Sequence, residues 1–97
     1  MFRHVVMFQW TETADASQRA TAVEALQAWA EVAHEFGSVS IGTDAGLNAS
    51  NFDVAVVGDF PDQAAYEAYV ADDRHVKLVR EQIAPLLGTR AAVQCVL

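Results

Sequence analysis

The amino-acid sequence predicts an α+β fold in which a four-stranded antiparallel sheet carries two helical segments on one face. Four short segments are rich in β-branched and aromatic residues that alternate in character, as strands do. Two longer segments repeat apolar residues every three or four positions, which is typical of amphipathic helices. The segments follow one another in the order β-α-β-β-α-β, so the sequence predicts the ferredoxin-like, split βαβ arrangement.

Composition narrows the class of protein. The chain has 97 residues, of which 53% are hydrophobic and 20% charged, so we expect a single domain over residues 1–97. Thirteen acidic residues against six basic ones give a net charge of −7, which argues against binding to nucleic acid or to an anionic membrane. Cys95 is the single cysteine and excludes an internal disulfide. Because we find neither a signal peptide nor a long apolar run, we expect a cytoplasmic protein.

The first expected strand runs from Phe2 to Trp10. Alternation along it gives one face with Phe2, His4, Val6, Phe8 and Trp10, which places an imidazole among aromatic and aliphatic neighbours. Val5 and Met7 belong to the opposite face, which is also mainly apolar. Both faces of this strand should therefore be covered.

The first helix is expected from about Ala16 to Phe36, with Asp15 as its N-cap and Thr13 as a competing cap. Gly37 should end it as a C′ glycine, and His34 should lie on the surface. The expected buried stripe consists of Val23, Leu26, Trp29, Ala30, Ala33 and Phe36.

The other three strands are expected from Ser38 to Asp44, from Phe52 to Phe60 and from Thr89 to Leu97. Gly42 inside the first of these suggests a bulge or a close backbone contact. Gly88 should end the helix that precedes the last strand.

Between Phe60 and Leu87 we expect a helix, a break and a second helix. Asp62 should cap the first, from Gln63 to Ala71, and either Asp72 or Asp73 should cap the second. The expected buried stripe of the second helix consists of Val76, Val79, Ile83 and Leu86 or Leu87.

The sheet face that carries Val5 and Met7 has no helix left to cover it. An exposed apolar face of this size marks an interaction surface. The simplest cover is the same sheet of a second copy, so we expect a homodimer in which two sheets face each other as a barrel.

Three polar residues stand out among apolar neighbours: His4, Tyr69 and His75. We expect them to be catalytic residues in one pocket between sheet and helices, because the helix break should lie over a central first strand. The expected substrate pocket is lined by Val6, Phe8, Val23, Leu26 and Leu78. Histidine transfers protons near neutral pH and a tyrosine hydroxyl can orient a carbonyl, so this set suits proton abstraction next to a carbonyl. No phosphate-binding or metal-ligand motif occurs, and we expect no cofactor and no metal.

Structural roles compete with each of these assignments. His4 can be a core histidine bonded to the backbone, Tyr69 a packing residue, and His75 an exposed residue or cap partner at a helix start. Asp72 and Asp73 are adjacent and point differently, which favours helix capping over a metal site.

Several stretches together resemble the stress-responsive A/B barrel domain (Dabb) family: HVVMF near the start, GTDAGLN before NFDVAVVGDF, and FPDQAAYEAYV followed by a histidine six residues after its last tyrosine. The resemblance covers essentially the whole chain and implies a small dimeric α+β barrel. One plant member of that family, olivetolic acid cyclase, closes a linear polyketide by aldol condensation. Matched to it, the resemblance implies His75 as the general base, Tyr69 orienting the substrate carbonyl, and His4 holding the substrate or an oxyanion.

Three hypotheses about function follow. The chain is a cofactor-independent cyclase or related lyase that acts on a small hydrophobic, polyketide-like or aromatic carbonyl compound. Alternatively, it is a non-catalytic, stress-associated dimer that binds a hydrophobic ligand. It can also be a cofactor-free monooxygenase, since related dimeric barrels include such enzymes.

Overall fold

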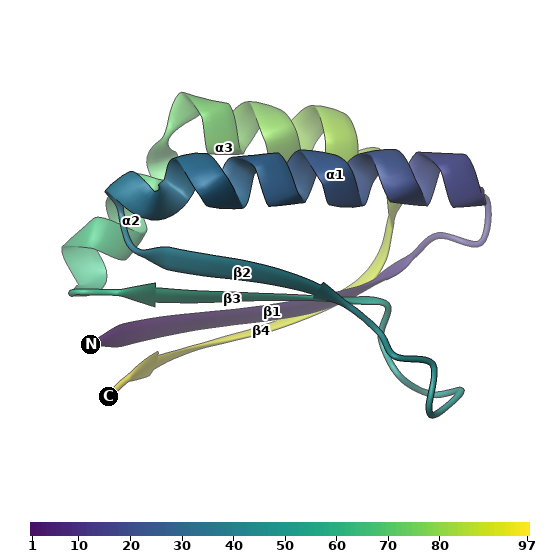
Figure 1. Ribbon diagram of the computed structural model, residues 1–97, viewed down its shortest axis with the longest axis horizontal. Coiled ribbons are helices and arrows are strands. Elements are labelled where there is room, and N and C mark those ends of the chain that lie inside the picture. Colours follow the sequence, from purple (N-terminus) through teal and green to yellow (C-terminus); the bar gives the residue numbers. More distant parts are fainter.

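The structure, a computed structural model that describes residues 1–97, confirms the predicted order of elements and the ferredoxin-like arrangement. One antiparallel sheet has the order β2-β3-β1-β4, with β1 (Phe2–Trp10), β2 (Ser38–Thr43), β3 (Val54–Phe60) and β4 (Leu87–Val96). The helices are α1 (Ala16–Val32), α2 (Gln63–Ala71) and α3 (Asp73–Leu78), and all of them cover the same face of the sheet (Figure 1). No helix combines the length and the apolar character that crossing a membrane requires.

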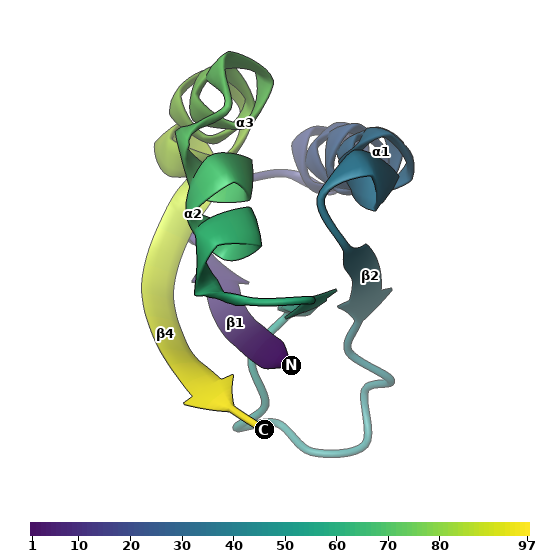
Figure 2. The ribbon, with the colours of Figure 1, turned by 90° about the vertical axis from the view of Figure 1, so that its left-hand side faces the viewer.

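Strand β1 is central, as predicted, and pairs with β3 on one side and β4 on the other. His4 therefore lies between Gly58 and Gln94, on the face of the sheet toward the helices. Figure 2 shows the helices stacked above the sheet on that side. The core between the two layers includes Phe2, Val6, Phe8, Leu26, Trp29, Phe60 and Tyr69.

Helix α1 begins with a capping box that selects Asp15 over Thr13. The Asp15 carboxylate accepts from the Gln18 backbone N–H at 2.8 Å, and the Gln18 side chain accepts from the Asp15 N–H at 2.9 Å. The α-helical part ends at Val32 and a 3₁₀ turn (Ala33–Glu35) completes it. Its buried side is formed by Ala22, Leu26, Trp29, Ala30 and Ala33, with Val23 and Phe36 partly buried.

Gly37 ends the first helical segment as predicted: it follows the C-cap Phe36, and its N–H donates to the Ala33 carbonyl at 3.2 Å. Its φ is not positive, since Gly46 is the glycine with a positive φ, at 78°. Gly37 permits a close approach between two segments of the chain, since a Cβ there would overlap the carbonyl oxygen of Asp59 in β3. The prediction for Gly42 is wrong: it makes neither a bulge nor a close contact, because it pairs in regular register with Ala55 and nothing lies within 4 Å of where its Cβ would be.

The helix break predicted in the second half of the chain is confirmed. Asp62 caps α2 by accepting from the Ala65 N–H at 2.9 Å. Asp72 has extended backbone angles (φ −59°, ψ 133°) and caps α3 by accepting from the Arg74 N–H at 2.9 Å. Beyond α3 the chain continues as a π-helical turn (Val79–Ile83) and a 3₁₀ turn (Ala84–Leu86). Pro85 in the last turn has no N–H to donate, which disfavours a regular α-helix here.

The wider π turn changes which residues face the core. Val76 is 45% exposed, so its place in the predicted buried stripe is wrong, and Val79 is 37% exposed. Ile83 is buried as predicted, and Leu78 packs against the core in their place. Gly88 does not end a helix but lies in β4, where a Cβ would come 2.9 Å from the Trp10 carbonyl oxygen.

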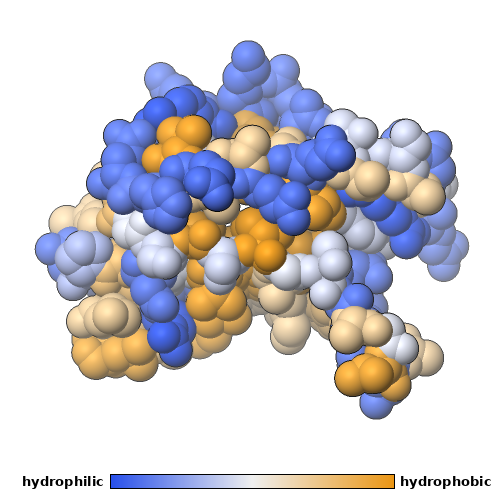
Figure 3. All heavy atoms as spheres, in the orientation of Figure 1, coloured by the Kyte–Doolittle hydropathy of each residue, from blue (hydrophilic) through white to orange (hydrophobic).

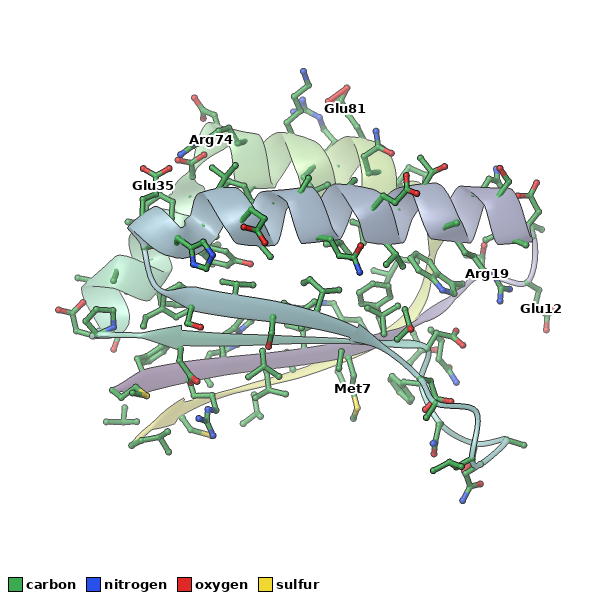
Figure 4. All side chains as sticks on the ribbon, viewed as in Figure 1. Met7, Glu12, Arg19, Glu35, Arg74 and Glu81 are labelled. Carbon is green, nitrogen blue, oxygen red and sulfur yellow. The ribbon has the colours of Figure 1, made fainter.

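The sheet face away from the helices is open, as the sequence predicts. We call it the outer sheet face; its residues include Arg3, Val5, Met7, Ala55, Val57, Asp59, Ala91, Val93 and Cys95. Met7 is 45% and Val93 is 53% exposed, and Figure 4 shows Met7 pointing away from the helices. Near one edge of this face, Arg3 donates two hydrogen bonds to Asp59, at 2.7 and 3.1 Å.

Candidate functional site

A cavity of about 310 Å³ lies between the sheet and the helices. Sixteen residues line it and thirteen of them are hydrophobic, which is the composition expected of a small-molecule pocket. Its walls come from β1, β2, β3, α1, α2, α3, the π turn and β4. Figure 3 shows hydrophobic atoms at the surface between α1 and the sheet, below a largely hydrophilic outer face of the helix.

The structure brings His4, Tyr69 and His75 together around this cavity. Of the residues expected to form the substrate pocket, four line the same cavity: Val6, Phe8, Leu26 and Leu78. Val23 does not. It lies about one helical turn before Leu26, in a surface depression with Trp10 and Arg19.

His4 is 6% exposed and is held by a side chain of β4. Its Nδ1 lies 2.8 Å from the amide nitrogen of Gln94. An amide nitrogen donates, so Nδ1 accepts, and the neutral ring carries its proton on Nε2. Burial lowers the pKa of His4, and the nearby Arg90 lowers it further, so the ring is neutral at pH 7. His4 is therefore a hydrogen-bond donor through Nε2, and its partner is a side chain rather than the backbone.

Tyr69 is the most enclosed polar side chain around the cavity, with 3% of its surface exposed. Its ring centroid lies 4.8 Å from that of His75 and 5.6 Å from that of Trp29. Burial raises the pKa of Tyr69, so its hydroxyl keeps its proton at neutral pH and can donate it in a hydrogen bond.

His75 lies in the first turn of α3, just after the break. Its Nδ1 is 3.2 Å from the carbonyl oxygen of Val70. A carbonyl can only accept, so Nδ1 carries the proton and Nε2 keeps a free lone pair. Burial lowers the pKa of His75, while the Val70 carbonyl and Asp72 oppose that effect. A neutral imidazole with one nitrogen free is the form that a general base requires.

The break that positions Tyr69 and His75 is fixed by a charged cluster. Arg74 donates to the Asp72 carboxylate at 2.9 Å and to Glu35, at the end of α1, at 2.6 Å. The hydrogen bonds from Arg74 lower the pKa of Asp72 to about 2. The guanidinium also lies 5.5 Å from the ring centroid of Trp29. Figure 4 shows Glu35 and Arg74 together at this end of the helical layer. Asp72 therefore acts in helix capping and ion pairing.

Three further polar side chains of the cavity escaped prediction. Tyr66 lies between His4 and Phe60, with ring centroids 4.8 and 5.6 Å away; its spacing of three residues from Tyr69 was the available signal. Trp29 was expected only as a core residue, yet its buried indole Nε1 lies at the cavity, where it makes no hydrogen bond of good geometry but lowers the pKa of the neighbouring Tyr69 hydroxyl. Arg90 reaches the cavity from β4, and nothing in the local sequence signals this.

The chemistry open to this arrangement is acid–base chemistry on a small molecule. His75 offers a free basic nitrogen, while Tyr69 and the Nε2 of His4 offer protons to an oxygen atom that becomes negatively charged. No group of three or more His, Cys, Asp or Glu side chains is placed to hold a metal ion.

The chain is similar to one known protein family and to several solved structures. The family model of the stress responsive A/B barrel domain matches residues 2–96. A search of the curated proteins found no match. Among solved structures, a dimeric ferredoxin-like protein of unknown function from Thermobifida fusca is 33% identical, with 99% of this chain and 90% of that chain covered and a TM-score of 0.88.

Two further solved structures share the fold at low identity. The hydroxynitrile lyase of Passiflora edulis is 16% identical, with 99% of this chain and 92% of that chain covered and a TM-score of 0.81. An antibiotic biosynthesis monooxygenase is 13% identical, with 100% and 98% covered and a TM-score of 0.77. At these identities the likeness is one of fold. Since the family model covers nearly every residue, the chain belongs to the stress-responsive A/B barrel domain family.

Proposed function

We propose that this chain is a cofactor-independent enzyme of the cyclase or lyase type that acts on a small hydrophobic carbonyl compound. The observation that carries the proposal is the state of His75: the Val70 carbonyl holds its proton on Nδ1, which leaves Nε2 free beside Tyr69 in an apolar cavity. In water an imidazole has no such orientation, so the geometry favours one proton transfer over others.

The proposed step starts with a carbonyl compound whose oxygen lies near the Tyr69 hydroxyl. His75 Nε2 takes a proton from the adjacent carbon, and the electron pair forms an enolate whose oxygen accepts hydrogen bonds from Tyr69 and from His4 Nε2–H. The enolate carbon then attacks a second carbonyl of the same molecule, closing a ring, and the protonated His75 returns its proton to the new alkoxide. Proton and charge balance without an external reagent.

Trp29 supports an oxygen-bearing ligand. Its buried N–H makes no hydrogen bond of good geometry, although it lies close enough to the Tyr69 hydroxyl to lower the pKa of that group, so a ligand oxygen would supply a better acceptor. The indole lies against the rings of both Tyr69 and His75, so this acceptor would sit close to the proposed reacting atoms.

A lyase reaction uses the same groups. For a cyanohydrin, His75 Nε2 takes the hydroxyl proton, the C–CN bond breaks as the carbonyl forms, and the leaving cyanide takes up the proton. The structure of the Passiflora edulis hydroxynitrile lyase supports including this reaction, because that enzyme shares the fold over nearly the whole chain.

We also propose that the chain acts as a homodimer through its outer sheet face. Met7 and Val93 are about half exposed on a largely apolar surface that no helix covers. The related Thermobifida fusca protein is dimeric, which supports the same assembly here.

Two alternative functions use the same cavity. The hydrophobic lining by thirteen of sixteen residues equally favours a stress-associated dimer that binds a hydrophobic ligand without reaction. The fold shared with an antibiotic biosynthesis monooxygenase supports a cofactor-free oxygenase. Oxygen uptake with an anthrone substrate identifies the oxygenase, and binding without turnover identifies the ligand-binding protein.

The deciding experiment offers the purified protein a linear polyketide analogue and, separately, mandelonitrile. We expect acceleration of ring closure or of benzaldehyde release, lost by a factor of roughly 100 or more in His75→Ala. His34→Ala is the matched control, because His34 is exposed on the surface and lies outside the cavity. Identical product formation with and without protein, for both substrates, would contradict the enzymatic proposal.

A further inference from the structure

We infer that the cavity takes a small monocarboxylate: an apolar molecule whose carboxylate pairs with Arg90 at the cavity mouth. The inference names the chemical class of ligand, and it rests on the proposed function only in that both place a small molecule in the same cavity. It depends on the charge of the lining, on the absence of a partner for Arg90, and on where β4 places this residue.

The lining carries one permanent charge. Arg90 is the only Lys or Arg in the cavity lining, and the lining contains no Asp or Glu. In the whole chain, by contrast, acidic residues outnumber basic ones by 13 to 6. His4 and His75 also line the cavity, and burial lowers the pKa of both, so both are neutral at pH 7. The cavity is therefore a positively charged site within a strongly acidic protein, which selects for an anion.

Arg90 has no hydrogen-bond or ion-pair partner, whereas two other arginines are paired with acidic residues. Arg3 is bound to Asp59 at 2.7 Å, and Arg74 to Asp72 at 2.9 Å. The guanidinium of Arg90 keeps all of its donors available for a ligand, and its planar fork fits the two oxygens of a carboxylate.

The register of the sheet places Arg90 at the mouth. Arg90 pairs with Phe8 of β1, so its side chain lies on the helix side of β4, which is an edge strand. Further along the same face, Gln94 binds His4. Arg90 is exposed while the β1 residues beside it are buried, so a bound carboxylate would stay near solvent with the apolar body of the ligand along β1.

The charge of Arg90 acts on the polar groups of the cavity. Burial lowers the pKa of His4, and Arg90 acts in the same direction. Burial raises the pKa of Tyr66, and Arg90 opposes it. A ligand carboxylate at Arg90 would therefore lie within electrostatic range of both rings.

Size and charge favour a small carboxylate over a phosphate. With about 30 Å³ for each water-sized group, a cavity of 310 Å³ holds roughly ten non-hydrogen atoms. A phosphate monoester carries nearly two negative charges and favours several donors or a helix N-terminus, whereas Arg90 is the single cation here. An aromatic or branched acid such as 3-phenylpropionate is small enough for the cavity and carries a single negative charge.

The test compares 3-phenylpropionate with 3-phenylpropionamide, which has the same shape and no charge, in an NMR-detected titration. We expect the acid to bind roughly fivefold to tenfold more tightly at low ionic strength, with the preference shrinking as salt is added. Arg90→Gln should bring the two affinities together without changing that of the amide, and Arg90→Lys should keep part of the preference. Arg80→Gln is the matched control: it removes the same charge from an exposed position outside the cavity.

Equal affinities for acid and amide, a preference that survives in Arg90→Gln, or no binding of either probe would overturn the inference. The two proposals fail separately. Turnover of a neutral substrate without a preference for the acid would remove this inference and keep the proposed reaction. Preference for the acid without turnover of any substrate would keep this inference and remove the proposed reaction.

Discussion

The Nδ1 of His75 lies 3.2 Å from the carbonyl oxygen of Val70, across the break between α2 and α3. Val70 belongs to the last turn of α2. Because the helix ends there, no N–H of a following turn bonds to the Val70 carbonyl, which can therefore accept a hydrogen bond from His75. The helix break thus supplies both the space for His75 and the group that selects its tautomer. Tyr69, adjacent to Val70, is brought to the same point by the same turn.

The His75 ring should titrate below its ordinary pKa of 6.5, because burial is the largest influence on it. Since the neutral ring is the base, catalytic activity should rise as pH increases through this lowered pKa and then level off. NMR titration of the His75 ring protons gives the midpoint directly. A midpoint at or above 6.5, or an activity that falls as pH rises toward 7, would contradict the role of His75 as a base.

Protein stability should fall as the solution becomes mildly acidic. Burial lowers the pKa of both His4 and His75 in the folded state, so between the folded and unfolded pKa values the unfolded chain binds more protons. The free energy of unfolding therefore keeps its full value above about pH 6.5 and decreases as the pH falls below that value. Urea unfolding at pH 7.5, 6.5 and 5.5 measures this. Asp59 and Asp72 have lowered pKa values and contribute only at more acidic pH. A free energy of unfolding that is constant or rises over this range would show that the two rings are not desolvated.

Alanine at Gly37 should destabilise the fold by about 2 kcal/mol or more, because the new methyl group would overlap the backbone of β3 at Asp59, which cannot yield as a side chain can. Gly42→Ala is the matched control, since its Cβ would meet nothing within 4 Å; we expect a change of less than about 0.5 kcal/mol, or a small gain. Chemical denaturation of the two variants measures both. Equal losses at the two positions would mean that the close packing against β3 does not explain the need for glycine at Gly37.

Met7→Asp should convert the proposed dimer to a monomer, because it would bury an unpaired charge between the outer sheet faces. Val76→Asp is the control: Val76 is equally exposed, at 45%, but lies on α3 and away from that face. Sedimentation at micromolar concentration distinguishes a particle of 10.5 kDa from one of twice that mass. If the wild-type chain sediments as a monomer, or if only Val76→Asp dissociates, the outer sheet face is not the interface.

Local patterns were sufficient for most of the fold. Asp15 and Asp62 were recognisable as helix caps because a cap is a short-range bond to a nearby N–H. The alternation of β1 placed His4 toward the helices for an equally local reason. Local patterns did not predict what distant chain segments determine. The need for glycine at position 37 comes from β3, more than twenty residues later.

The cavity shows the same division. Tyr69 and His75 could be paired across a visible break in the apolar pattern, and the structure places both at the cavity. Arg90 could not be found, because its position depends on the register between β4 and β1, and a shift of one residue would turn it to the outer sheet face. Val76 was misplaced because the π turn that follows α3 departs from the period of 3.6 residues on which the stripe depends.

The extended residue at Asp72 has a consequence for how this cavity can be altered. Each residue of an α-helix turns the next by about 100°, so the length of the break sets the angle between the side chains on its two sides. Inserting or deleting one residue there would swing His75 away from Tyr69 while every cavity residue kept its identity. The break is thus a point of angular adjustment, through which a change in chain length alone can alter the chemistry that the same set of side chains supports.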